Sequence, residues 1–132
     1  MTFTDIDART WTLGDLMDAW AGRVLRFLRE LDTSYDETPS AWGAHDLVAA
    51  LYTRDRVEAG LAVTPSDDRR LAVVEATDEL FRLFTVEDDA DSLLLVGYDI
   101  PRSPWWWRRV PARGPVVIEL TEIADRLARP HD

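Results

Sequence analysis

Apolar residues recur at three- and four-residue spacing near the start of the chain, which predicts an amphipathic helix over residues 13–31. Thr12 and Asp15 have the spacing of a capping box at its beginning. Acidic residues near the beginning of this segment and arginines near its end match the direction of a helix dipole. The apolar positions are Leu13, Leu16, Met17, Trp20, Val24, Phe27, Leu28 and Leu31.

Two further helices are predicted to begin at Thr-Pro pairs. Thr38 is placed to cap the second helix, with Pro39 at the first helical position, where a missing N–H costs nothing. Gly60 is suited to end that helix. Thr64 and Pro65 repeat the arrangement before a third amphipathic segment. The repeated start predicts helices joined by short turns.

The pattern after residue 85 is less regular. Residues 92–96 follow a cluster of acids and precede Gly97, which favours a short helix, although an apolar run of this length also suits a strand. Residues 101–115 are predicted to be a loop because four prolines interrupt them. Pro115 then begins a helix that reaches about Ala128. Its predicted buried residues are Val116, Leu120, Ile123, Ala124 and Leu127.

These elements predict an all-α fold. We expect one domain over residues 1–132, an antiparallel bundle of four main helices with the Pro-, Trp- and Arg-rich loop before the last of them. Short disordered tails are expected at residues 1–9 and 129–132.

Composition narrows the functional classes. The 132 residues carry a net charge of −10, which opposes binding to duplex nucleic acid or to anionic membranes. Cysteine is absent, so disulfides and thiolate chemistry are excluded. The chain has no long apolar run and no secretory leader, and we expect a cytoplasmic protein without a membrane span. Lysine, asparagine and glutamine are also absent, as is typical of a high-GC bacterial genome.

Catalytic and metal-binding motifs are not recognisable in the sequence. We therefore expect no metal and no cofactor, and we favour a protein that is not an enzyme. His45 lies next to Asp46 near the expected start of the second helix, and a small-ligand pocket between helices remains an alternative, with a possible enzymatic role. Its candidate lining is Trp20, Trp42, His45 and Tyr52.

The most distinctive stretch is residues 101–115, which we call the Trp–Arg segment. It contains four arginines and no acid, for a net charge of +4, while the eleven arginines and 25 acids elsewhere give −14. Trp105, Trp106 and Trp107 are adjacent, so their three rings cannot all face the same way. At least one ring must then meet solvent or a second surface.

This geometry predicts a contact site of the segment with a protein partner or with a second copy of the chain, since tryptophan and arginine lead the residues that dominate protein interfaces. The candidate contact residues are Trp105, Trp106, Trp107, Arg108, Arg109 and Arg113. Binding of single-stranded nucleic acid through the same side chains is an alternative. So is a structural lid, in which two rings close the end of the bundle and the arginines pair with acids among residues 87–91.

Overall fold

The structure is a computed structural model that describes residues 2–4, 10–33 and 41–129. Within these ranges the chain is mainly helical, as the sequence predicts. The helices are α1 (Leu13–Glu30), α2 (Ala44–Val63), α3 (Asp68–Phe84), α4 (Ser92–Leu95), the 3₁₀ helix η1 (Trp105–Arg108) and α5 (Pro115–Ala128). Four short strands, β1 (Thr2–Thr4), β2 (Thr10–Thr12), β3 (Thr85–Glu87) and β4 (Arg109–Pro111), form two antiparallel pairs, β1 with β2 and β3 with β4.

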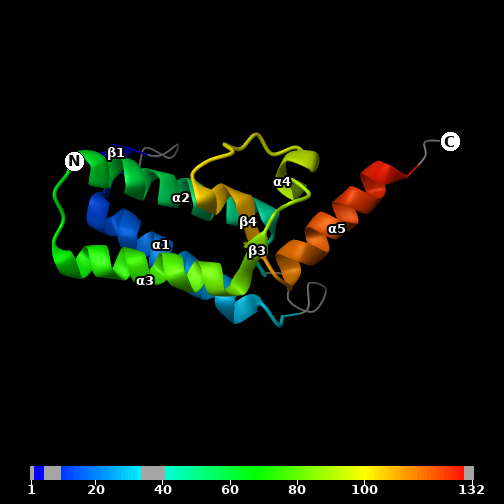
Figure 1. Ribbon diagram of the computed structural model, residues 1–132, viewed down its shortest axis with the longest axis horizontal. Coiled ribbons are helices and arrows are strands. Elements are labelled where there is room, and N and C mark those ends of the chain that lie inside the picture. The colour runs from blue at the N-terminus through cyan, green and yellow to red at the C-terminus, as the bar shows by residue number, and fades with distance from the viewer. Residues whose placement is uncertain (1, 5–9, 34–40, 130–132) are drawn as a thin grey trace.

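Helix α1 packs against both α2 and α3, and the three lie side by side in Figure 1. Its predicted capping box is confirmed: the Thr12 side chain accepts a hydrogen bond from the Asp15 amide, and the Asp15 carboxylate accepts one from the Thr12 amide. The predicted apolar stripe is its buried face, since Leu16, Met17 and Trp20 are almost fully enclosed. The first prediction from periodicity is therefore correct in both boundary and face.

The predicted boundaries of α2 need correction. Thr38 and Pro39 lie outside the described residues, but the helix begins only at Ala44, after a turn in which the Gly43 amide donates to the Asp46 carboxylate. Gly60 does not end the helix, because it lies within it and its carbonyl accepts from the Thr64 amide. The helix ends where Pro65 disfavours helical backbone at Thr64, which is extended (φ −126°, ψ 122°).

Helix α3 begins later than predicted. Its N-cap is Asp67, whose carboxylate accepts from the Arg70 amide at 2.8 Å, and Thr64 and Pro65 belong to the connection before it. Asp and Thr both suit an N-cap, so the sequence offers two starts. Asp67, which directly precedes the first helical residue, forms the cap.

The short helix predicted at residues 92–96 is confirmed as α4, and Gly97 follows it with φ +104°. Asp88 holds its beginning, because its buried carboxylate accepts hydrogen bonds from the amide and the hydroxyl of Ser92. The antiparallel pair of β3 and β4 was not predicted. It replaces part of the expected loop, and it pairs Val86 with Val110.

Helix α5 begins at Pro115 as predicted but is buried only over its first part. Val116 and Leu120 are enclosed, whereas Ile123 is only partly covered, Ala124 is exposed and Leu127 is 63% exposed. The predicted burial of Ala124 and Leu127 is therefore wrong. Figure 1 shows the reason: α5 runs away from the layer of α1, α2 and α3, so its far half meets none of these helices along its length.

Both ends of the chain include residues outside the described ranges. Of the expected N-terminal tail, residues 2–4 pair with residues 10–12 as strands, while residues 1 and 5–9 lie outside the described ranges, as do 130–132. No helix in the described part of the chain combines the length and the apolar character that crossing a bilayer requires.

Gly114 fixes the turn into α5, and it gives a test of the fold. Its φ is +97°, and a Cβ added there would lie 2.7 Å from the Leu31 carbonyl oxygen; at Gly97 a Cβ would meet nothing within 4 Å. Both alanine substitutions should cost about 1–3 kcal/mol through backbone strain. We expect Gly114→Ala to lower the free energy of unfolding by about 1–3 kcal/mol more than Gly97→Ala, because only the former overpacks. Urea denaturation followed by circular dichroism measures both, and equal losses would contradict the packing at Leu31.

Candidate interaction site

The three adjacent rings of the Trp–Arg segment lie on a single turn of 3₁₀ helix, which separates them. Trp105 to Arg108 make up η1, which follows Pro104 in extended conformation. A 3₁₀ helix turns by about 120° per residue. The three indoles therefore leave the backbone in different directions: Trp106 and Trp107 enter the interior and Trp105 stays partly exposed.

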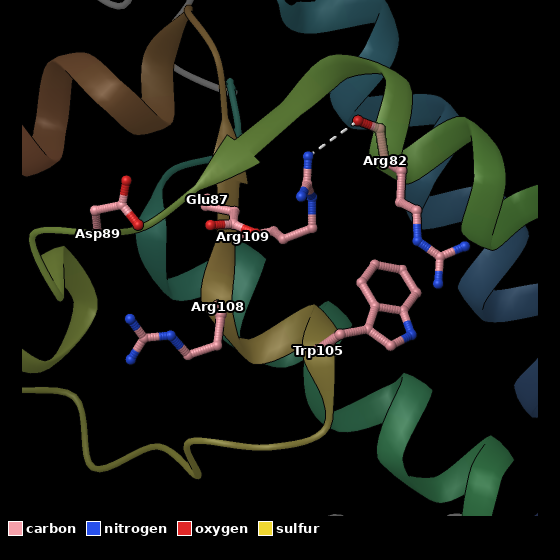
Figure 2. Close-up of a pocket in the computed structure, with 6 residues that line it drawn as sticks. All are labelled: Arg82, Glu87, Asp89, Trp105, Arg108 and Arg109. Atoms are coloured by element: carbon pink, nitrogen blue, oxygen red, sulfur yellow. Dashed lines mark hydrogen bonds between the residues drawn. The ribbon is translucent and has the colours of Figure 1, made fainter.

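Trp105 remains partly exposed at the wall of a surface pocket of about 490 Å³. The guanidinium of Arg82, from the end of α3, lies 3.8 Å from the centroid of its ring. Figure 2 shows the arginines and Trp105 around the pocket, with contributions from α3, β3, η1 and β4. We call this site the Trp105 pocket; it is lined by Arg82, Glu87, Asp89, Trp105, Arg108 and Arg109.

The arginines at this pocket are held in place by their own chain. Arg109 donates through Nε to the Thr85 hydroxyl at 2.8 Å and through a terminal nitrogen to the Thr85 carbonyl at 2.7 Å. The same side chain reaches the Arg82 carbonyl at 3.2 Å. Arg108 pairs with Asp91 at 2.7 Å. Fixed guanidinium groups lose less entropy on binding a partner than mobile ones.

The pocket has mixed charge, with three arginines against Glu87 and Asp89. Both acids lie within residues 87–91, where the lid alternative expects the acidic partners of the arginines. The cation–π contact places the Arg82 guanidinium over the partly exposed Trp105 ring, which also packs against Phe81 and Trp106. This arrangement suits a partner that presents both charged and apolar groups.

Arg113, the last predicted contact residue, does not line the Trp105 pocket. Its guanidinium donates to both carboxylate oxygens of Asp32, at 2.7 and 3.3 Å, and both side chains are exposed. The hydrogen bond and the charge of Arg113 hold the pKa of Asp32 below its ordinary value. Any stability from this pair is therefore present above the ordinary carboxyl pKa and is lost as the pH falls through the lowered value.

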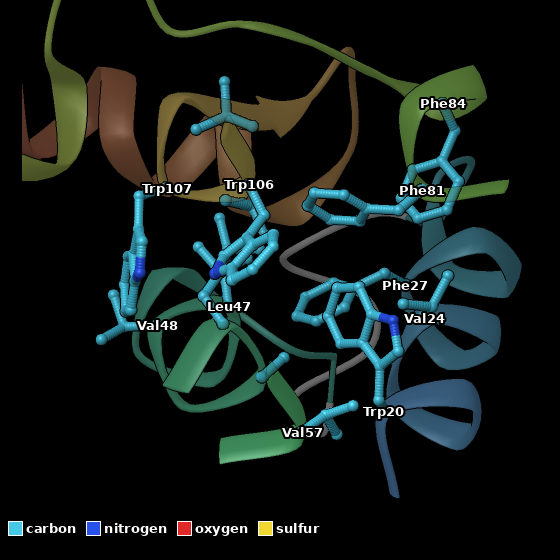
Figure 3. Packing of buried hydrophobic residues seen from close by; sticks show 14 of the residues in the cluster. Trp20, Val24, Phe27, Leu47, Val48, Val57, Phe81, Phe84, Trp106 and Trp107 are labelled. Carbon is cyan, nitrogen blue, oxygen red and sulfur yellow. The ribbon is translucent and has the colours of Figure 1, made fainter. Parts of the chain in front are cut away.

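Trp106 and Trp107 anchor the segment in the interior. Only 2% and 1% of their surfaces are exposed, and Figure 3 shows both rings above α2, beside Leu47 and Val48. Trp107 also packs edge-on against Tyr52, with ring centroids 4.8 Å apart. Two of the six predicted contact residues are thus buried, as the lid alternative expects.

Asp55 of α2 receives both buried indoles. Its Oδ1 accepts from Trp106 Nε1 at 2.8 Å and from Trp107 Nε1 at 2.9 Å, and its Oδ2 lies 3.0 Å from the latter. A buried indole N–H needs such an acceptor. One carboxylate therefore fixes the orientation of two rings, and with them the outward direction of Trp105.

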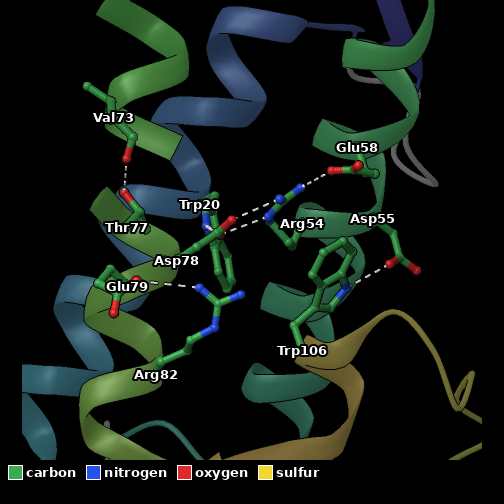
Figure 4. A network of polar contacts seen from close by, with 10 residues as sticks. All are labelled: Trp20, Arg54, Asp55, Glu58, Val73, Thr77, Asp78, Glu79, Arg82 and Trp106. Atoms are coloured by element: carbon green, nitrogen blue, oxygen red, sulfur yellow. Dashed lines mark hydrogen bonds and ion pairs between the residues drawn. The ribbon is translucent and has the colours of Figure 1, made fainter. Parts of the chain in front are cut away.

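A buried ion pair between Arg54 and Asp78 lies against the Trp106 ring. The Arg54 guanidinium lies 4.3 Å from the Trp106 ring centroid and donates from two nitrogens to the Asp78 carboxylate, each at 2.9 Å. Asp78 also accepts from Trp20 Nε1 at 2.9 Å, so that α1, α2 and α3 meet in one network (Figure 4). Burial lowers the pKa of Arg54, but its bonds to Asp78 and Glu58 outweigh this and raise it above the ordinary value.

The alternative ligand pocket predicted from Trp20, Trp42, His45 and Tyr52 is not assembled by the structure. Trp20 packs against Phe81, whereas Trp42 packs against Phe27. The His45 side chain is exposed. Tyr52 lies against Trp107 and donates its hydroxyl to the Asp99 carbonyl. The four residues thus have separate neighbours.

Three residues of the Trp105 pocket were not predicted as contact residues: Arg82, Glu87 and Asp89. Glu87 faces Arg109 across the strand pair, an arrangement that no local spacing reveals. Arg82 lies in the last turn of α3, where the sequence pattern predicts only an exposed helical arginine. Within the described ranges, no group of three or more His, Asp or Glu side chains is placed to hold a metal ion.

Comparison with protein-family models, with curated proteins and with solved structures finds no match for this chain. The Trp105 pocket therefore has to be interpreted from its own residues.

Proposed function

We propose that the protein is a non-catalytic interaction module that binds a protein partner through the Trp105 pocket. In this proposal the chain acts in the cytoplasm as one domain, an antiparallel helical bundle that presents the Trp–Arg segment. The observation that carries the proposal is that the three adjacent indoles occupy different positions. Trp106 and Trp107 are buried on Asp55, while Trp105 stays at the surface beside Arg82.

Several features support a protein partner over single-stranded nucleic acid. Nucleic acid needs a continuous run of cations, whereas Glu87 and Asp89 lie among the arginines of this pocket. The net charge of −10 adds long-range repulsion of phosphates. A protein surface with an apolar side chain for Trp105, a carboxylate for the arginines and a basic group for the two acids matches the pocket better.

The test compares wild type with Trp105→Ala and Arg108→Ser in affinity capture from native cell lysate, with and without nuclease. We expect a protein that wild type retains and both variants lose, with retention unaffected by nuclease. Any captured protein would then be purified and its dissociation constant measured. Each substitution should weaken binding by about tenfold or more, as expected at an interface hot spot.

Arg126→Ser is the matched control, because Arg126 is an exposed arginine in the last turn of α5. Capture that is identical for wild type and both pocket variants would contradict the proposal. Nuclease-sensitive capture would instead support single-stranded nucleic acid. Light scattering on the purified chain tests a second copy as the partner: a dimer lost only in the Trp105 and Arg108 variants would place self-association at this pocket.

A further inference from the structure

Asp91 has an unusual backbone conformation for a residue that carries a side chain. Its φ and ψ are +51° and +44°, and in the described part of the chain no other residue except glycine has a positive φ. This left-handed region disfavours a Cβ, and aspartate tolerates it because its short side chain can hydrogen-bond to nearby backbone. Asp91 directly precedes α4, yet its carboxylate makes no capping hydrogen bond to that helix. The usual local compensation is therefore missing.

Asp88 makes the local contacts that Asp91 does not make. Its carboxylate accepts hydrogen bonds from the amide and the hydroxyl of Ser92, the first residue of α4. The Asp91 carboxylate instead contacts the Trp–Arg segment: Oδ1 accepts from Arg108 at 2.7 Å, and Oδ2 lies 3.9 Å from a terminal nitrogen of Arg102. The side chain of Asp91 thus holds arginines rather than the beginning of the helix.

The position of Arg108 bears directly on the Trp105 pocket. Arg108 lines this pocket, whereas Asp91 is not among the described residues that line it. Figure 2 shows the Arg108 side chain directed away from Trp105, on the side of the pocket where Asp89 lies. Glu87 and Asp89 line the same pocket and would attract a guanidinium group that Asp91 did not hold. Asp91 therefore binds Arg108 from outside the pocket and keeps it off the pocket's own acids.

We propose, on the basis of the function proposed above for this pocket, that Asp91 is a positioning residue that fixes Arg108 for the partner. A guanidinium group that is already ordered loses less entropy when a partner binds it. The carboxylate of Asp91 then affects binding through Arg108, while its left-handed backbone affects stability separately. Asp91→Gly and Asp91→Ala distinguish the two effects, because both remove the carboxylate and only the former removes the Cβ.

Heteronuclear NMR of the ¹⁵N-labelled full chain tests the position of Arg108 without a partner. The ¹⁵N–¹H NOE of the Arg108 Nε–Hε group should fall in both Asp91 variants, since the guanidinium loses its ionic contact. The Arg109 signal should keep its NOE, because that side chain is held by Thr85. An unchanged Arg108 NOE in Asp91→Gly would overturn the proposal.

Stability and binding should respond differently to the two substitutions. Urea denaturation should give a higher midpoint for Asp91→Gly than for Asp91→Ala, since glycine adopts a positive φ without strain. Both variants should nevertheless bind the protein captured by wild type about two- to tenfold more weakly than wild type does. If Asp91 were only structural, binding would follow stability, and Asp91→Gly would bind more tightly than Asp91→Ala.

Asp32→Ala is the matched control for Asp91→Ala. Asp32 pairs with Arg113, an arginine of the same segment that is not among the residues lining the pocket. This variant should bind as wild type does. Wild-type affinity in both Asp91 variants, with binding still lost in Trp105→Ala, would overturn the role of Asp91 alone. Capture by Trp105→Ala at the wild-type level would instead contradict the proposed function of the pocket.

Discussion

Replacing Asp78 with alanine is expected to lower the free energy of unfolding by about 3–5 kcal/mol. Arg54 is only 5% exposed, and Asp78 supplies the acceptors for two of its nitrogens. Without that carboxylate the guanidinium remains charged and buried, and among the described residues its one remaining ionic partner is the exposed Glu58. The Trp20 indole loses its acceptor in the same step. The loss therefore combines an uncompensated charge with an unsatisfied donor.

Urea denaturation followed by circular dichroism measures this loss. Glu58→Ala is the matched control, because it removes the exposed carboxylate of the same arginine and should cost less than about 1 kcal/mol. The double variant Arg54→Met/Asp78→Leu should recover much of the stability lost in Asp78→Ala, since an apolar pair leaves no buried charge. A loss in Asp78→Ala no larger than that in Glu58→Ala would show that the pair does not bear on stability.

The second large effect is expected within the Trp–Arg segment itself. Trp107→Ala should lower the free energy of unfolding by about 3–5 kcal/mol, as removal of a large buried ring does. The ring is almost fully enclosed and packs against Tyr52, and it provides one of the two indole donors to Asp55. Trp105→Ala should cost about 1 kcal/mol, because its ring is partly exposed.

Parallel thermal and urea denaturation of the two variants makes this comparison, and each serves as the other's control in sequence and in size of substitution. Similar losses in both would contradict the division between anchor and exposed ring. The result also bears on function. Only a Trp105→Ala variant that stays folded allows lost capture of a partner to be attributed to lost contact rather than to unfolding.

The candidate site was predictable in part. The adjacency of Trp105, Trp106 and Trp107 shows that the rings must separate, and the local excess of arginine marks the segment as unusual. Which ring stays outside depends on Asp55, some fifty residues earlier, because its carboxylate accepts both buried indoles. Sequence spacing has no signal for that pairing. The same holds for Arg82, which reaches Trp105 only because α3 and η1 meet in space.

Local interactions explain the features that could be predicted from the sequence alone: the mainly helical class, the α1 capping box, the beginning of α5 at Pro115, and α4 followed by Gly97. Each depends on residues within a few positions of one another. Tertiary structure alone decided the β3–β4 pair and the exposure of Leu127. These features depend on contacts between distant segments, whose formation is governed by the packing of whole helices rather than by local pattern.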